Sequence, residues 1–86
     1  MKQFEYTVRD PLGIHARPAG MLVKEAKAFS DTIVTVTKGS ATVNATHLIK
    51  LMRLGVKRGD VVTVVAEGPN EDAAIIAISN FFQNNL

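Results

Sequence analysis

Hydrophobic residues recur along this chain with two different spacings, and the order of these spacings limits the fold more than any other feature of the sequence. Phe4, Tyr6 and Val8 alternate with polar residues, which is the two-residue period of a strand with one buried face. From Ala19 to Phe29 the apolar residues recur at helical spacing instead. The pattern predicts a first strand and a first helix, with a turn at residues 10–13 between them.

The two spacings continue through the middle of the chain. The β-branched run at residues 32–37 predicts a second strand, and residues 41–44 predict a brief third strand after a hairpin turn at residues 38–40. Thr46 and His47 are expected to open a short helix that Gly55 ends.

A fourth strand and a third helix complete the predicted elements. Residues 60–67 contain four valines, and Asn70 is the expected N-cap of a helix whose apolar stripe extends to Phe82. The order is βαββαβα. Strands with one apolar face and amphipathic helices that must cover it predict an α+β, two-layer fold with a four-stranded antiparallel sheet. A chain of 86 residues has room for one such core, so a single domain over residues 1–86 is expected.

Composition restricts the location and the partners of the protein. Cysteine is absent, so neither a disulfide framework nor a thiolate metal site is expected, and the cytoplasm is the expected location. No apolar stretch approaches the roughly 20 residues of a membrane span. The net charge of +2 is scattered and lacks basic runs with interleaved aromatics, so membrane insertion and nucleic-acid binding are not expected. Folding should need no cofactor.

Residues 13–18 place an imidazole at the start of the predicted first helix, with a guanidinium two residues later. Unpaired backbone N–H groups and a partial positive charge make a helix start suited to phosphate. We therefore expect His15, Ala16 and Arg17 to hold a phosphoryl group, with Arg17 as a fixed cation. Positive surroundings disfavour the imidazolium form, which leaves His15 with a nucleophilic ring nitrogen.

The simpler interpretation is that His15 is a surface histidine and Arg17 a solvated charge. A cation in the first helical turn opposes the helix dipole, and this favours the anion site. A metal site built from His15 and His47 is not expected, because no carboxylate or cysteine stands at ligand spacing from either residue.

The short second helix carries apolar residues on two sides. Its leucines, Leu48, Leu51 and Leu54, fit a stripe that faces the core, whereas Ile49 and Met52 fall beside that stripe and should be partly exposed. An apolar rim on a small domain suggests a docking surface for a partner. Equally, these two side chains could fill gaps beneath a loop.

Residues 13–19, Gly-Ile-His-Ala-Arg-Pro-Ala, resemble the active-site signature of the HPr family, the phosphocarriers of the bacterial sugar phosphotransferase system. Chain length, element order and the glycine after the short helix are also similar to that family's open-faced sandwich, with three helices on one face of the sheet. The resemblance implies a monomeric carrier rather than a stand-alone enzyme. Enzyme I would phosphorylate Nδ1 of His15, which would donate to an enzyme IIA domain in phosphoenolpyruvate-dependent sugar uptake.

The resemblance also implies roles for other residues. Arg17 would stabilise the phosphoryl group, and Leu48, Ile49 and Met52 match the positions of the family's apolar docking patch. Many relatives carry a kinase-regulated serine at the start of the short helix. Compared with these relatives, this chain has one extra residue in this region. If that residue lies in the hairpin at residues 38–40, His47 takes the place of the serine and cannot be phosphorylated by the serine kinase. If it lies in the helix, Thr46 takes the place and offers a hydroxyl.

Two other functions fit parts of the sequence. A regulatory module of the same fold, in a nitrogen-related branch or docked to a transcription regulator, would not restore sugar uptake. A basic α+β nucleic-acid binder is suggested by a sequence pI of about 9.2. The open sheet face, however, carries Glu5, Thr7 and Arg9 from the first strand and no aromatic stacking platform.

Overall fold

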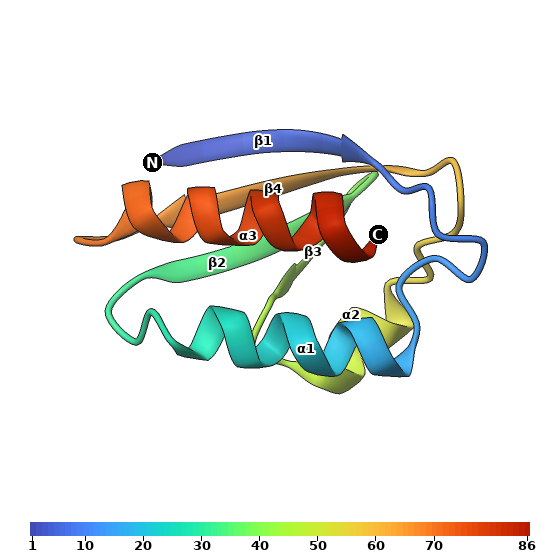
Figure 1. Cartoon of the computed structure of the whole chain (residues 1–86), viewed down its shortest axis with the longest axis horizontal. Coiled ribbons are helices and arrows are strands. Elements are labelled where there is room, and N and C mark those ends of the chain that lie inside the picture. The colour runs from blue at the N-terminus through green and yellow to red at the C-terminus, as the bar shows by residue number, and fades with distance from the viewer.

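A computed structural model describes residues 1–86, and its elements follow the predicted βαββαβα order (Figure 1). The elements are β1 (Lys2–Thr7), α1 (Ala16–Lys27), β2 (Ile33–Lys38), β3 (Ala41–Asn44), α2 (Leu48–Arg53), β4 (Val61–Glu67) and α3 (Glu71–Asn85). No helix combines the length and hydrophobicity that a membrane crossing requires. The α+β sandwich predicted from the two spacings is confirmed.

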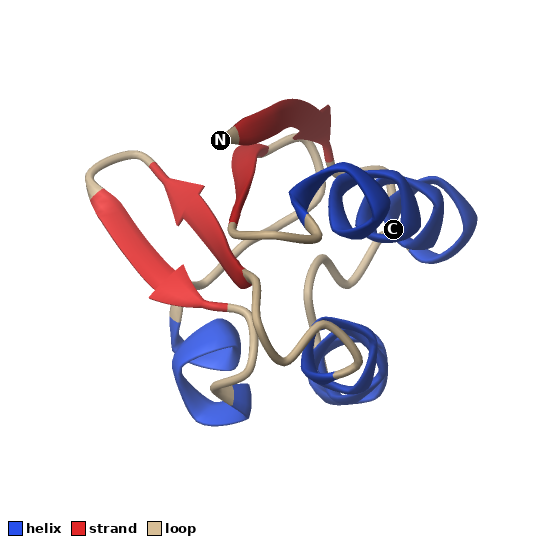
Figure 2. Cartoon of the chain, turned by 90° about the vertical axis from the view of Figure 1, so that its left-hand side faces the viewer, coloured by secondary structure: helices blue, strands red, loops and turns tan.

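The four strands form one sheet in the order β1-β4-β2-β3, with every neighbouring pair antiparallel. The three helices lie together on one side of the twisted sheet (Figure 2), so the other face is open. Val34 and Val36 of β2 point into the core, and the alternate residues Thr35 and Thr37 therefore face away from the helices. On the open face the hydroxyls of Thr37 and Thr42 lie 2.8 Å apart and hydrogen-bond across β2 and β3.

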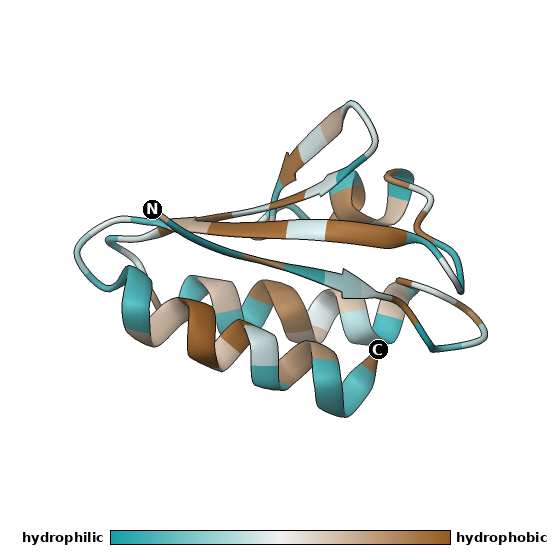
Figure 3. Cartoon of the chain, turned by 90° about the horizontal axis from the view of Figure 1, so that it is seen from above, coloured by the Kyte–Doolittle hydropathy of each residue, from teal (hydrophilic) through white to brown (hydrophobic).

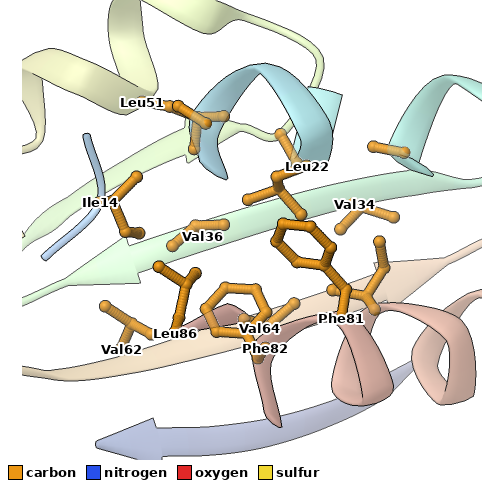
Figure 4. Close-up of a cluster of buried hydrophobic side chains, with 14 of the residues drawn as sticks. Ile14, Leu22, Val34, Val36, Leu51, Val62, Val64, Phe81, Phe82 and Leu86 are labelled. Carbon is orange, nitrogen blue, oxygen red and sulfur yellow. The ribbon is translucent and has the colours of Figure 1, made fainter. Parts of the chain in front are cut away.

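The core lies between the helices and the inner face of the sheet. β4 is its most continuously hydrophobic strand, as Figure 3 shows, and it lies between β1 and β2 in the sheet. Phe82 of α3 is fully buried and meets the rings of Phe4 and Tyr6 edge to face, at centroid distances of 5.6 and 5.4 Å. Figure 4 shows Phe82 and its neighbour Phe81 among valines of β2 and β4. The α3 stripe predicted from helical spacing thus packs on the sheet.

The predicted N-cap position of α3 is confirmed, but the side chain there has another role. Asn70 occupies the N-cap position of α3, but its side chain makes no capping hydrogen bond there. Instead, its Nδ2 donates to both carboxylate oxygens of Asp31, at 3.1 and 2.9 Å, and its backbone N–H donates to Thr32. The side chain is used to tie the start of α3 to the loop before β2, a contact that helical periodicity does not reveal.

The segment before α1 is held by a close backbone approach at Gly13. Gly13 has φ of +66°, and a Cβ there would overlap the Val56 carbonyl oxygen and lie 2.8 Å from the Lys57 Cα. Ile14 follows directly and points into the core (Figure 4). It donates its N–H to the same Val56 oxygen at 3.2 Å. Since Ile14 faces inward, the next residue, His15, faces the surface.

We expect Gly13→Ala to destabilise the protein much more than Gly39→Ala. Gly39 has φ of +59° but nothing within 4 Å of an added Cβ, so Gly39→Ala should cost only the left-handed backbone strain, roughly 1 kcal/mol. Gly13→Ala adds a clash with backbone atoms and should cost roughly 3 kcal/mol. Urea unfolding of the two variants measures both losses. Equal losses would contradict the close approach described for Gly13.

Candidate functional site

The turn before His15 is set by the sequence Asp-Pro-Leu-Gly. Aspartate is favoured at the first position of a type I turn, proline at the second and glycine at the fourth. The Gly13 N–H donates to the Asp10 carbonyl at 2.9 Å, and the Leu12 N–H donates to Asp10 Oδ1 at 2.8 Å. The chain is thereby turned from the end of β1 to the start of α1.

His15 is the N-cap residue of α1, with an extended backbone and no side-chain hydrogen bond to the helix. Its side chain is 36% exposed. The backbone N–H groups of Ala16 and Arg17 donate to no acceptor of the protein. Pro18 follows and has no N–H, so these two groups are the free donors of the first turn.

The Arg17 side chain is exposed and makes no hydrogen bond or ion pair within the protein. It lines an open pocket of about 230 Å³ together with the imidazole. The full lining is Asp10, His15, Arg17, Pro18, Met21 and Asn85. The pocket therefore brings together the imidazole and the guanidinium that the sequence singled out.

Three lining residues were missed by the sequence analysis. Met21 is 44% exposed and lies off the apolar stripe of α1, a signal that the analysis used only for the second helix. Asn85 comes from the last turn of α3, and no local pattern links it to His15. The sequence predicts Asp10 only as part of a turn, yet its Oδ1 lies 3.8 Å from His15 Nε2. The sequence predicts only positive groups around the ring, and the structure adds a carboxylate.

The second helix exposes more apolar surface than predicted. Leu51 is fully buried and Leu54 is half-buried, as expected for the core-facing stripe. Leu48, however, is 38% exposed beside Ile49 at 59% and Met52 at 40%. Its predicted place in the core is wrong, because a helix of only six residues has too few turns to define one buried side. These three exposed side chains form what we call the α2 patch.

Thr46 and His47 lie at the start of α2. His47 is its exposed N-cap residue, and its side chain makes no capping hydrogen bond. Thr46 precedes the cap, and both its hydroxyl and its N–H donate to Asn44 Oδ1, at 2.7 and 2.9 Å. No three His, Cys, Asp or Glu side chains gather anywhere in the structure in a way that would hold a metal ion.

The α2 helix lies beside the N-terminal half of α1 (Figure 1), and its far end is fixed by a small charged network. Lys38 Nζ, from the end of β2, donates to the Gly55 carbonyl at 2.7 Å, just after α2, and lies 3.0 Å from Asp60 Oδ2. The Asp60 carboxylate also accepts the Lys57 N–H at 2.8 Å. The hydrogen bond from Lys57, and then the one from Lys38, holds the pKa of Asp60 below its usual value.

Comparison with known proteins gave one consistent family. The family model described as "PTS HPr component phosphorylation site" matches residues 2–84. The phosphocarrier protein HPr of Mycoplasma genitalium is 38% identical over 85 residues, which are 99% of this chain and 97% of that protein.

Two solved structures from Thermoanaerobacter tengcongensis are also similar. A crystal structure of HPr-C-His has a TM-score of 0.91 and 37% identity, and covers 98% of this chain and 93% of that one. An HPr dimer has a TM-score of 0.76 and 37% identity, and covers 98% of this chain and 95% of that one.

The lowered pKa of Asp60 makes the stability of the protein depend on pH. A carboxylate with a folded-state pKa below its unfolded value of 3.8 stabilises the fold above that value, and this stabilisation is lost as the pH falls through the folded-state pKa. Asp60→Asn should therefore be less stable than the parent near neutral pH, and the difference should close below about pH 4. The free energies of unfolding of Asp60→Asn and of the parent, measured from neutral pH to below about pH 4, test this dependence. A difference that does not change with pH would contradict it.

Proposed function

This chain belongs to the HPr family of the bacterial phosphotransferase system, and on that premise we propose that it carries phosphoryl groups between proteins on His15. In the proposed cycle, enzyme I phosphorylates Nδ1 of His15. The phosphorylated chain then donates to enzyme IIA domains in phosphoenolpyruvate-dependent sugar uptake. The supporting observation is a half-exposed imidazole at a helix start where two backbone N–H groups have no partner.

The proposed phosphoryl site uses the groups that this helix start leaves unpaired. The N–H groups of Ala16 and Arg17 would donate to phosphoryl oxygens, and the helix dipole favours the negative charge there. The Arg17 guanidinium, which has no other partner, would supply a forked donor. Phosphoryl transfer passes through a loose transition state with charge spread over the three oxygens, so positioned positive groups do most of the work.

The α2 patch is the proposed docking surface. The bond from Ile14 N–H to Val56 O connects the segment after α2 to the residue before His15, so the α2 patch and the imidazole keep a fixed relation. Met21, exposed on α1, adds an apolar side chain to the pocket of His15. Exposed Lys50 and Arg53 stand on the same short helix. We therefore expect a partner surface with apolar pockets and an acidic rim.

The position of the family's regulatory serine is proposed to be His47, with Thr46 as the alternative. At His47 no serine-type phosphorylation is possible. A phosphoryl group on Thr46 would have to displace its hydroxyl from the bond with Asn44. Action in the cytoplasm as a monomer stays a prediction, and the dimeric relative described above makes the oligomeric state worth measuring.

We expect His15→Ala to abolish phosphorylation by enzyme I and labelled phosphoenolpyruvate, whereas His47→Ala should be labelled like the parent. The two variants remove the only histidines of the chain, so each serves as the control for the other. In the parent the adduct should be labile in acid and stable in base. Labelling of His15→Ala at the parental level would refute the site. Restoration of sugar uptake in a strain that lacks its own carrier tests the transport role against a purely regulatory one.

We expect a charge in the α2 patch to weaken partner binding without harming the fold. Ile49→Glu combined with Met52→Glu should lower the affinity for enzyme I about tenfold or more, because a docking contact that buries both side chains would have to bury two carboxylates. Ile76→Glu is the matched control, since Ile76 is 62% exposed on α3, outside the patch. Titration calorimetry measures all three proteins. Equal affinities for the double variant and the parent would remove the α2 patch from the proposed interface.

A further inference from the structure

We propose that Asp10 is a positioning residue for His15, whose carboxylate keeps the ring proton on Nε2 and so leaves the lone pair on Nδ1. The inference deepens the function proposed above and rests on it. Its starting point is the distance of 3.8 Å between Asp10 Oδ1 and His15 Nε2. No other carboxylate lies within ion-pair distance of this imidazole.

Asp10 is held in place from several directions. Its N–H donates to the Leu86 carbonyl at 2.9 Å, and its own carbonyl accepts the Gly13 N–H at 2.9 Å. Its Oδ1, the oxygen that faces His15, also accepts the Leu12 N–H at 2.8 Å. The Asp10 side chain is only 26% exposed. The carboxylate is therefore a fixed negative charge beside the ring rather than a mobile surface group.

A neutral imidazole carries one N–H and one lone pair, and its surroundings decide which nitrogen has which. A carboxylate only accepts hydrogen bonds, so it favours the tautomer with the proton on the nearer nitrogen. Here the nearer nitrogen is Nε2. The separation is longer than a hydrogen bond, but hydrogen bonds of this kind are often long in the unbound state and shorten in the reactive complex.

The proton on Nε2 also simplifies the transfer. The Nδ1 lone pair forms the bond to phosphorus while the bond from phosphorus to the donor's leaving atom breaks, and the electron pair of that bond stays with the donor. The ring keeps its Nε2 proton and becomes positive beside the Asp10 carboxylate. In donation to the next protein, the Nδ1–phosphorus bond breaks and its electron pair returns to Nδ1. Neither direction requires a proton from outside the site.

The charge of Asp10 can be separated from its role in the turn. Asparagine is as suitable as aspartate at the first position of a type I turn, and its side-chain oxygen can still accept the Leu12 N–H. Asp10→Asn therefore removes the negative charge and keeps the turn. Asp10→Ser is a second variant of the same kind, with a hydroxyl as the acceptor.

The test is ¹⁵N NMR of the unphosphorylated full chain with labelled histidine, at a pH where the rings are neutral. The Nδ1 and Nε2 shifts give the share of each tautomer. In the parent, His15 should be almost entirely in the Nε2–H form. In Asp10→Asn its shifts should move toward those of His47, which has no carboxylate within ion-pair distance and is the internal reference. The rate of phosphorylation by enzyme I should fall about tenfold in the same variant.

Unchanged His15 shifts in Asp10→Asn overturn the inference, even if the rate falls, because Asp10 would then act in another way. The amide signals of Leu12 and Gly13 report whether the turn is kept. If these amide signals move in Asp10→Asn, the turn has changed, and the His15 shifts of Asp10→Ser decide the inference instead. A parent chain that enzyme I does not phosphorylate would refute the proposed function instead, and the tautomer measurement would still decide the role of Asp10.

Discussion

The contact between Gly13 and the backbone at Val56 is the constraint on which the functional end of the molecule depends. It allows no side chain at Gly13, and with the Ile14 hydrogen bond it joins the chain before α1 to the chain after α2. Burial of Ile14 then directs the next residue outward. A single close approach thus sets both the exposure of the imidazole and its distance from the exposed apolar residues of α2.

The start of α1 lacks the features that usually stabilise a helix start. Its N-cap side chain accepts no hydrogen bond, and no acidic residue lies in its first turn. An N-cap side chain that accepts such a bond typically stabilises a helix by about 1 kcal/mol. By contrast, α3 has Glu71 and Asp72 in its first turn. The positive end of the helix dipole is therefore balanced by carboxylates in α3 and left without them in α1. The helix start without acidic residues is the one that carries His15.

Much of this structure could be predicted from the sequence, because one face of nearly every element is buried and the spacing reveals that face. The strand Ala41–Asn44 has the predicted bounds, and the stripe ending at Phe82 packs as expected. Periodicity does not tell which distant group a polar side chain will meet. The bond of Asn70 to Asp31 and the approach of Asn85 to His15 therefore could not be foreseen. The prediction that Leu48 lies in the core is wrong for another reason, since a helix of six residues has too few turns to define one buried side.

The two chain ends lie in opposite halves of the molecule along its long axis (Figure 1). The Leu86 carbonyl accepts the N–H groups of Arg9 and Asp10, at 2.6 and 2.9 Å, so the last turn of α3 forms part of the wall around the imidazole. An affinity tag or fluorophore fused after Leu86 would emerge next to that wall and crowd incoming proteins. The same fusion placed before Met1 would emerge near Glu71, well away from it. For assays with partner proteins, the amino end is the better point of attachment.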